Sequence, residues 1–272
     1  MKSGNPFDLV FLKKKLLGVG SSGRVFSARH ILTGVYYAIK VSSKSMYHEF
    51  RVGSLFVNPN LSRPVELWFD GIDYYLVMEL LSQVSMLDLA RVTTQELILF
   101  FSQLAKVVQY MHNCGFLHCD IKPNNFAFDV SSSGAKRILK LFDFGLAKLI
   151  LDDAKIIGTV AYLSPEALRE NCSTTASDVW ALTMCIMEIM MGLRKPFVFS
   201  LFPEQQHMAA IVGKIATLKE PPILASFRED KSPFGKILLQ ILETGLAIEP
   251  ERRDLETIIR LLEQLIAFSS ES

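Results

Sequence analysis

The segment FLHCDIKPNNFAF, residues 116–128, contains residue types that could carry out chemistry. It places His118, Asp120, Lys122 and Asn125 close together, with a spacing typical of a catalytic loop. The segment FDFG adds the carboxylate of Asp143. Two carboxylates and an amide brought together could hold magnesium through their oxygen atoms. Taken singly, each of these residues could instead be an ordinary loop aspartate or turn asparagine.

A glycine-rich stretch, GVGSSGRV, has the pattern G-x-G-x-x-G-x-V, formed by Gly18, Gly20, Gly23 and Val25. Glycines allow a backbone to approach a phosphate closely and to present its N–H groups. A strand is predicted after this stretch and not a helix, which argues against a dinucleotide-binding fold. Taken alone, the stretch also fits a plain hairpin.

Lys40 ends the apolar run YAIK on a predicted strand. Burying its charge without a partner would be costly, and a phosphate together with a carboxylate would satisfy it. The alternative is a lysine that extends from the end of the strand into solvent.

The elements that must position these residues change in type along the chain. Strands are predicted at 11–20, 24–30, 35–42, 63–70 and 74–81, with one short helix at 46–56 and a hairpin turn from Asp70 to Asp73. From about residue 94 the apolar residues recur at helical spacing, and residues 237–248 and 255–268 are amphipathic. A sheet followed by helices predicts an α+β fold with two lobes, joined near residues 79–85.

The composition excludes several classes of protein. The chain has 272 residues, half of them hydrophobic, which is enough for one large domain or two joined lobes. A net charge of +1 argues against a protein that binds nucleic acid by bulk charge. The apolar stretch 179–193 carries Glu188 and is short for a membrane span, so we expect a buried helix and no membrane partner. The N-terminus shows no secretory signal, and four cysteines without a CxxC pair favour reduced thiols in the nucleus or cytoplasm.

Three further segments complete an ordered set of motifs: GTVAYLSPE (158–166), SDVWAL (177–182) and PERR (250–253). In this order and with these separations, the motifs resemble those of the eukaryotic protein kinase family, from residue 17 to about residue 255. The resemblance implies a two-lobed protein kinase fold of the α+β class. An N-terminal antiparallel sheet lobe is expected at 1–81 and a helical C-terminal lobe at 82–268, as one catalytic domain of about 10–268. Lys122 and Thr159 indicate the serine/threonine type.

The resemblance also implies roles in phosphate transfer from ATP. The phosphates would be covered by the glycine loop, which comprises Leu17, Gly18, Val19, Gly20, Ser21, Ser22, Gly23, Arg24 and Val25. Lys40 would bind the α- and β-phosphates, while Asn125 and Asp143 would hold Mg²⁺. Asp120 would accept the proton of the substrate hydroxyl, and Lys122 would meet the γ-phosphate.

The adenine would be bound by residues from several strands: Val25, Ala38, Met78, Glu79, Leu81 and Ala127. In this resemblance Met78 is the gatekeeper and Glu79 to Leu81 are the hinge. Ala127 stands where the family usually has a larger aliphatic residue, so the pocket is expected to be roomy. Outside the nucleotide site, Asp178 would brace the catalytic loop.

Two positions depart from the family pattern. The glutamate that pairs with Lys40 falls at Glu49, only nine residues later, so we expect the first turns of its helix to be missing. The alternative is that Glu49 is a solvated helix residue. Glu166 and Arg253, in contrast, match the family's ion pair.

The second departure is Cys119, which stands where the family has an arginine that binds a phosphate on the activation segment. That segment, LAKLILDDAKII at 146–157, contains no Ser, Thr or Tyr. Because receptor and acceptor are absent together, we hypothesise activity without loop phosphorylation. The loop would be held by a partner or by apolar contacts of its own residues Leu149, Ile150, Leu151, Ile156 and Ile157. Cys119 itself fits a small buried thiol better than a redox sensor.

An active kinase that uses ATP and Mg²⁺ is the favoured function, because a degraded kinase typically lacks at least one of Lys40, Asp120, Lys122, Asn125 and Asp143. The alternative is a pseudokinase or scaffold that binds nucleotide or a partner without catalysis. A small-molecule phosphotransferase has a similar loop, but GTVAYLSPE and SDVW, which build a peptide-docking platform in kinases, argue against it.

Segments such as DIKPNNF resemble the cell-cycle kinases that license replication origins, and also the casein-kinase-1-like group. The first group needs an activating subunit and no loop phosphate. We therefore expect a protein substrate, an activating subunit and a role in cell-cycle control.

Overall fold

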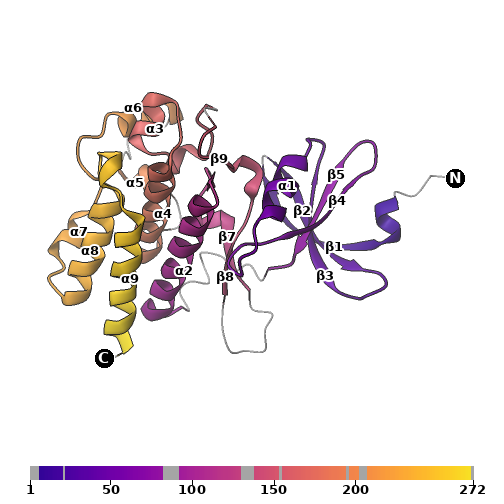
Figure 1. Ribbon diagram of the computed structural model, residues 1–272, viewed down its shortest axis with the longest axis horizontal. Coiled ribbons are helices and arrows are strands. Elements are labelled where there is room, and N and C mark those ends of the chain that lie inside the picture. The colour runs from indigo at the N-terminus through magenta and orange to yellow at the C-terminus, as the bar shows by residue number, and fades with distance from the viewer. Residues whose placement is uncertain are drawn as a thin grey trace. The chain divides into compact units, whose positions relative to one another are not determined.

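The computed structural model describes residues 6–20, 22–81, 92–129, 138–152, 155–193, 196–201 and 207–270. The chain forms two compact units, one of Met1–Gln83 with Ala127–Gly145 and one of Val84–Phe126 with Leu146–Ser272. The antiparallel sheet of the first unit and the helices of the second confirm the predicted α+β kinase fold class (Figure 1). Residues 127–145 thus belong to the same unit as the sheet. The predicted lobe limits of 1–81 and 82–268 stay a prediction. Of the predicted junction, residues 82–85 lie outside the described part.

The first unit is built on a five-stranded antiparallel sheet with the order β1-β2-β3-β5-β4. Its strands are β1 (Phe11–Gly20), β2 (Gly23–His30), β3 (Tyr36–Ser42), β4 (Pro64–Phe69) and β5 (Tyr74–Glu79). All five lie where the sequence predicted strands. The predicted hairpin turn is also present, because Asp70 Oδ1 accepts hydrogen bonds from the backbone N–H groups of Ile72 and Asp73.

An aromatic cluster covers one face of this sheet. The short helix η1 (Pro6–Leu9) places Phe7 against Phe11 and Tyr75, with ring centroids 4.9 Å and 4.4 Å away. Phe7 is buried together with Ile39. The ammonium of Lys13 lies 5.7 Å from the centroid of the Phe7 ring. The segment that precedes β1 is therefore part of the hydrophobic core of the first unit.

The first unit also contains α1 (Tyr47–Leu55) and two short paired strands, β7 (Phe126–Asp129), whose first residue is grouped with the second unit, and β8 (Ile138–Leu141). Leu141 accepts a hydrogen bond from Ser62 N and donates its own N–H to Asn60 O, at 2.9 Å and 2.8 Å. These bonds tie β8 to the chain after α1, which explains why residues 127–145 belong to this unit.

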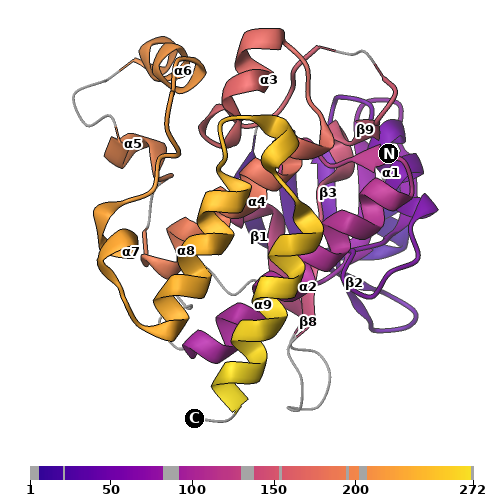
Figure 2. The same ribbon diagram turned by 60° about the vertical axis from the view of Figure 1, so that its left-hand side comes forward.

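The second unit consists of helices around α4. The helices are α2 (Thr94–Asn113), α3 (Pro165–Glu170), α4 (Thr175–Met190), α5 (Val198–Leu201), α6 (Met208–Ala216), α7 (Ala225–Glu229), α8 (Pro233–Gly245) and α9 (Leu255–Ser270). α9 packs against both α2 and α8, as Figure 2 shows. A small sheet pairs β6 (Phe116–Leu117) with β9 (Lys148–Leu149).

Particular residues determine where the helices of the second unit begin and how closely they pack. A capping box between Thr93 and Glu96 starts α2. α4 is buried from Ser177 to Ile189, which confirms the buried helix predicted in this region. Gly245 lets α8 approach α4 closely, because a Cβ there would overlap the side chain of Thr183. No helix among the described residues is both long and apolar enough to cross a membrane.

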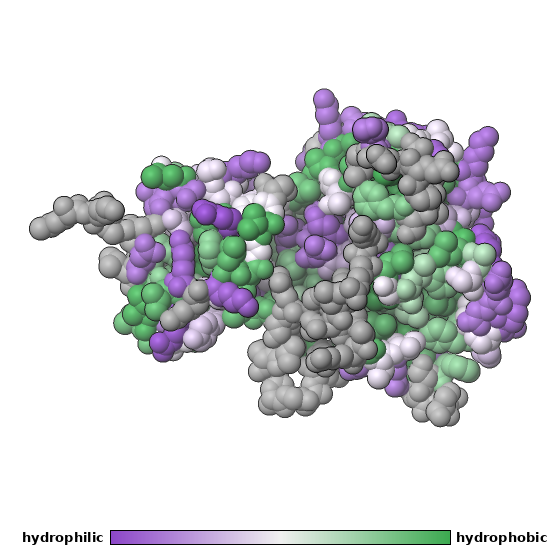
Figure 3. Space-filling model, turned by 180° about the vertical axis from the view of Figure 1, so that it is seen from behind, coloured by the Kyte–Doolittle hydropathy of each residue, from purple (hydrophilic) through white to green (hydrophobic). Residues whose placement is uncertain are grey.

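The surface mixes apolar and charged side chains, which Figure 3 shows on one face of the molecule. Large apolar residues that are mostly exposed include Val19, Leu32, Val57, Ile72 and Leu151. Single exposed apolar residues are normal on protein surfaces, so most of these need no special explanation.

Candidate active site

Lys40 lies at the centre of a buried charge cluster in the first unit. Its Nζ donates to both oxygens of Glu49, at 2.7 Å and 2.9 Å, and to Asp143 Oδ1 at 3.0 Å. Burial alone would lower the pKa of Lys40, but the charges of the two carboxylates outweigh it, and the pKa is raised above its ordinary value. Lys40 is thus held protonated. The alternative of a lysine that extends into solvent is wrong, because the residue is only 5% exposed.

Glu49 reaches Lys40 although its helix is short. α1 has nine residues and begins at Tyr47, so Glu49 lies in its first turn. This agrees with the expectation that the first turns are missing. The N-cap residue Met46 makes no capping hydrogen bond from its side chain, and Glu49 is buried. The alternative of a solvated Glu49 is therefore wrong.

Asp143 and Cys119 share an unusual backbone conformation. Their φ angles are 66° and 64°, and Asn171 is the third non-glycine residue with positive φ in the described part of the chain. Such conformations cost free energy and persist where the surrounding structure imposes them, often at functional sites. Two of the three residues lie in the motifs that the sequence singled out.

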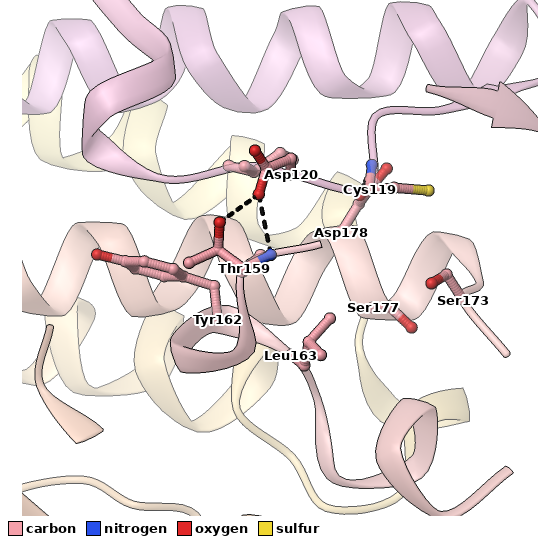
Figure 4. Close-up of a pocket in the computed structure, with 10 residues that line it drawn as sticks. Cys119, Asp120, Thr159, Tyr162, Leu163, Ser173, Ser177 and Asp178 are labelled. Carbon is pink, nitrogen blue, oxygen red and sulfur yellow. Dashed lines mark hydrogen bonds between the residues drawn. The ribbon is translucent and has the colours of Figure 1, made fainter. Parts of the chain in front are cut away.

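Asp120 is held by a set of donors within the second unit. Its Oδ2 accepts from Lys122 Nζ at 2.6 Å and from Asn125 Nδ2 at 2.9 Å. Its Oδ1 accepts from the hydroxyl and the backbone N–H of Thr159, at 2.6 Å and 3.0 Å (Figure 4). Lys122 Nζ also donates to the Thr159 hydroxyl at 2.8 Å. The structure thus brings together three predicted site residues and adds Thr159, which the sequence used only as an indicator of substrate type.

Asp178 holds the backbone that leads into Asp120. Its Oδ2 accepts from the N–H of His118 at 2.9 Å and lies 3.0 Å from His112 Nε2, and its Oδ1 accepts from the N–H of Cys119 at 3.0 Å. Burial alone would raise the pKa of Asp178, but the hydrogen bond and charge of His112 and the N–H donor of His118 lower it below its ordinary value. A charged Asp178 therefore braces the loop.

The Cys119 side chain lies at a small pocket beside this loop (Figure 4). The pocket is lined by Cys119, Asp120, Ile121, Thr159, Tyr162, Leu163, Ser173, Ser177, Asp178 and Ala181. Cys119 is buried, and burial raises the pKa of its thiol well above the ordinary value. The geometry agrees with an unreactive buried thiol. Gly158 packs on the Cys119 carbonyl, where a Cβ would overlap it.

The apolar residues of the activation segment are more exposed than the self-packing hypothesis requires. Leu149, Ile150 and Leu151 are 53%, 37% and 93% exposed, and Ile156 and Ile157 are half-buried. The expectation of apolar contacts that hold the loop is wrong for Leu151, and for the other four residues it stays a prediction. An apolar residue is buried only where another part of the chain offers a surface for it, and the sequence of the segment does not show this.

Backbone hydrogen bonds hold the described parts of this segment. Ile150 N donates to Gly115 O at 2.9 Å, and Ile156 N donates to Asn171 O at 3.0 Å. Leu149 also pairs with Phe116 between β9 and β6. These contacts need no particular side chain, so the sequence pattern carried no signal for them.

Two buried networks of hydrogen bonds lie in the region after the activation segment, and the first of them contains an ion pair. Arg253 donates to both oxygens of Glu166, at 2.6 Å and 2.9 Å, and lies over the ring of Trp180. The second network was not predicted: Glu188 accepts from the Tyr162 hydroxyl at 2.9 Å and from Phe197 N at 2.5 Å. Burial raises the pKa of Glu188 to about 7. The only signal for it was a glutamate inside an apolar run.

The predicted glycine loop is the turn between β1 and β2, where Gly18 pairs with Val25 and Gly20 with Gly23. A Cβ on Gly18 or Gly20 would meet no protein atom within 4 Å, so packing does not require these glycines. Gly23, with φ of 138°, has no room for a Cβ beside the Val41 carbonyl. Ser21 lies outside the described residues. The role in phosphate binding stays a prediction.

The predicted adenine contacts also lie in the first unit. Ala38 pairs with Met78 across β3 and β5, and Glu79 is the last residue of β5. Leu81 is half-buried, and Ala127 is buried on β7. The predicted roles of these residues in adenine binding stay predictions.

The candidate magnesium ligands belong to different units, Asn125 to the second and Asp143 to the first. Asn125 Nδ2 donates to the backbone oxygen of Asp120 at 2.8 Å and to its Oδ2 at 2.9 Å. These bonds use the amide nitrogen, so the amide oxygen of Asn125 is the atom suited to a cation. In the described part of the chain no three His, Cys, Asp or Glu side chains form a metal-binding group. Amide and carboxylate oxygens are both ligands that magnesium takes, together with several waters. That Asn125 and Asp143 bind one ion together stays a prediction.

Comparisons with known proteins show the family of this chain. The family model of the protein kinase domain matches residues 11–265. The Aurora kinase of Eremothecium gossypii is 31% identical over 195 residues, which are 65% of this chain and 52% of that protein. Human ribosomal protein S6 kinase alpha-1 is 28% identical over 199 residues, which are 67% of this chain and 26% of that protein. A cAMP-dependent protein kinase catalytic subunit-like protein of Caenorhabditis elegans is 31% identical over 196 residues, covering 66% and 48%.

The chain thus matches between about a quarter and about half of the length of these relatives. The kinase-domain match, in contrast, extends from β1 into α9 and includes every motif described above. The chain belongs to the protein kinase family.

Proposed function

We propose that this chain is a serine/threonine protein kinase that transfers the γ-phosphate of ATP to serine and threonine hydroxyls of protein substrates. The observation that carries the proposal is the hydrogen-bonded arrangement of Asp120, Lys122, Asn125 and Thr159. It orients a carboxylate and places a lysine ammonium beside it, which a phosphoryl-transfer site requires.

Each residue has a task that follows from its surroundings. The Asp120 carboxylate, fixed on both oxygens, would orient the substrate hydroxyl and accept its proton. Lys122 would stabilise the negative charge that develops on the transferred group. Lys40, held protonated by Glu49 and Asp143, would bind phosphate oxygens of ATP.

Magnesium fits the proposal through the oxygens of Asn125 and Asp143. When bound, it would neutralise charge on the phosphates of ATP. Asp120, through its bonds to Asn125, would keep the amide oxygen of that residue oriented as a ligand.

The kinase would act without phosphorylation of its activation segment. Cys119 cannot bind a phosphate as an arginine does, and residues 146–157 offer no hydroxyl to modify. Backbone bonds of Ile150 to Gly115 and of Ile156 to Asn171, which hold the described parts of the segment and involve no phosphate, support this proposal. A protein partner could also hold the segment in place. We propose that this partner is an activating subunit and that the kinase acts in cell-cycle control, which the resemblance of the motifs supports.

A pseudokinase or scaffold is the second candidate, and the short helix α1 favours it. Glu49 sits in an uncapped first turn, so less packing supports its contact with Lys40 than a longer helix would provide. Such a protein would bind nucleotide or a partner without transfer.

The test is γ-phosphate transfer from Mg-ATP to a generic basic or acidic protein substrate, with Asp120→Asn and Asp143→Asn as controls. Transfer by the wild type alone supports an active kinase that needs no loop phosphate. Binding of Mg-ATP without transfer, even after addition of candidate subunits, would favour the pseudokinase. Transfer only to amino sugars or choline would overturn protein kinase activity.

A further inference from the structure

An ion pair joins the last residue of β5 to β8 within the first unit. Lys140 Nζ donates to both carboxylate oxygens of Glu79, at 3.0 Å and 3.1 Å. The two residues are 61 positions apart in the sequence. No role was predicted for Lys140 from the sequence, and neither the catalytic roles nor the charge cluster of Lys40 uses it.

The pair is shielded from solvent more than the surface ion pairs of the chain. The side chains of Lys140 and Glu79 are 14% and 32% exposed. Those of Lys106 and Glu263, which form a similar pair in the second unit, are 51% and 52% exposed. Ion pairs on the surface contribute little because water and salt screen them, whereas a shielded pair with two contacts holds its geometry better.

Both partners are anchored on their own backbone. Glu79 pairs with Tyr37 in the ladder between β3 and β5. On β8, Leu141 exchanges hydrogen bonds with the chain at Asn60 and Ser62. The ammonium of Lys140 therefore connects β8 with the end of β5. It limits the movement of Glu79, the last residue of β5, and so of the backbone that continues to residues 80 and 81.

We propose that Lys140 is a positioning residue for nucleotide binding. It holds the carboxylate of Glu79 and thereby orders the backbone of residues 79–81 before adenine arrives. This inference rests on the proposed function and on the expectation, from the resemblance to protein kinases, that residues 79–81 bind the adenine ring. A backbone that is already ordered loses less conformational entropy on binding, so the pair acts on nucleotide affinity. Lys140 and Glu79 belong to the first unit, whereas Asp120, Lys122 and Thr159 hold one another within the second. We therefore expect the rate of transfer at saturating ATP not to depend on Lys140.

The experiment compares Lys140→Gln with Lys140→Arg, and uses Lys106→Gln as the matched control in an exposed ion pair. Binding of ADP and ATP is measured by calorimetry, and KM for ATP and kcat are measured by phosphate transfer. Lys140→Gln is expected to raise the Kd and the KM for ATP by about three- to tenfold. Its kcat is expected to stay within about twofold of the wild type. Lys140→Arg keeps the charge and is expected to retain most of the affinity, and Lys106→Gln is expected to change neither constant.

Two further variants separate positioning from a general loss of folding. Glu79→Gln in combination with Lys140→Gln is expected to weaken binding no more than either single change, because both remove the same contact. The exchanged pair Lys140→Glu with Glu79→Lys is expected to recover part of the affinity.

An unchanged Kd in Lys140→Gln would overturn the inference, as would additive effects of the two glutamine variants. A wild type that binds ADP but transfers no phosphate would overturn the proposed function alone, since the Kd comparison still decides the role of Lys140. A wild type that binds no nucleotide would overturn both.

Discussion

Thr159 donates two hydrogen bonds to one oxygen of Asp120, from its hydroxyl at 2.6 Å and from its backbone N–H at 3.0 Å. The same hydroxyl accepts from Lys122 Nζ. A residue of the GTVAYLSPE segment therefore orients the two side chains that would act on the substrate. This arrangement exists only when residues after the activation segment lie against the catalytic loop.

Replacing Thr159 by valine removes the hydroxyl and keeps the shape of the side chain. We expect kcat to fall by about tenfold or more, because two charge-assisted hydrogen bonds that orient Asp120 and Lys122 are lost. Thr159→Ser keeps the hydroxyl and is expected to stay near the wild type. Steady-state phosphate transfer and ADP binding measure the effect. A valine variant with normal kcat, or one that loses ADP affinity instead, would contradict the role.

Phe7 is expected to stabilise the first unit although it precedes the region matched by the kinase-domain model. It is only 1% exposed and stacks on Phe11 and Tyr75. Phe7→Ala is expected to lower the free energy of unfolding by about 3 kcal/mol, since it removes a ring from a packed cluster. Asp8→Ala, at an exposed neighbour, is the control, and chemical denaturation is the measurement. Equal stability of both variants would show that the segment does not belong to the folded core.

Much of the fold could be predicted because its signals are local. Strands such as β3 and β5 are short runs rich in apolar and aromatic residues, and Asp70 and Gly71 mark a turn between β4 and β5. The contacts of Lys40 with Glu49 and of Glu166 with Arg253 connect residues within recognised motifs. Their spacing along the chain carried the information.

Other features could not be predicted because they depend on surfaces that fold together from distant segments. Glu188 meets Tyr162 across 26 residues, and Lys140 meets Glu79 across 61. The exposure of Leu151 has the same origin, since an apolar residue is buried only where another element offers it a surface. Periodicity reports which face of an element is apolar, and not what lies opposite it.

Cys119 is expected to resist alkylation, in contrast to Cys114. Burial raises the pKa of the Cys119 thiol, so the reactive thiolate is scarce near neutral pH, whereas Cys114 is exposed. Iodoacetamide treatment of the folded protein followed by mass spectrometry of its peptides measures both sites. Cys114 is expected to be labelled first, and phosphate transfer should survive that labelling. Rapid labelling of Cys119 would revive the redox-sensor alternative.

Glu188 should give the stability of the protein a distinct dependence on pH. Burial raises the pKa of this carboxyl to about 7 in the folded protein. In the unfolded chain the group releases its proton near its ordinary value of about 4.3. Between these two values the folded state binds more protons than the unfolded state. The contribution of Glu188 to the free energy of unfolding is therefore full below the lower value, falls as pH rises, and levels off above about 7.

Glu188→Gln resembles the protonated carboxyl, because its amide can accept from Phe197 N and donate toward the Tyr162 hydroxyl. We expect the variant to lack this part of the pH dependence and to be more stable relative to wild type at pH 8 than at pH 5, by about 2–3 kcal/mol. Urea denaturation of both proteins across this range measures the difference, and other titrating groups cancel in the comparison. Parallel stability curves for the two proteins would mean that Glu188 titrates at its ordinary pKa, and that its bonds to Tyr162 and Phe197 offset the cost of burying its charge.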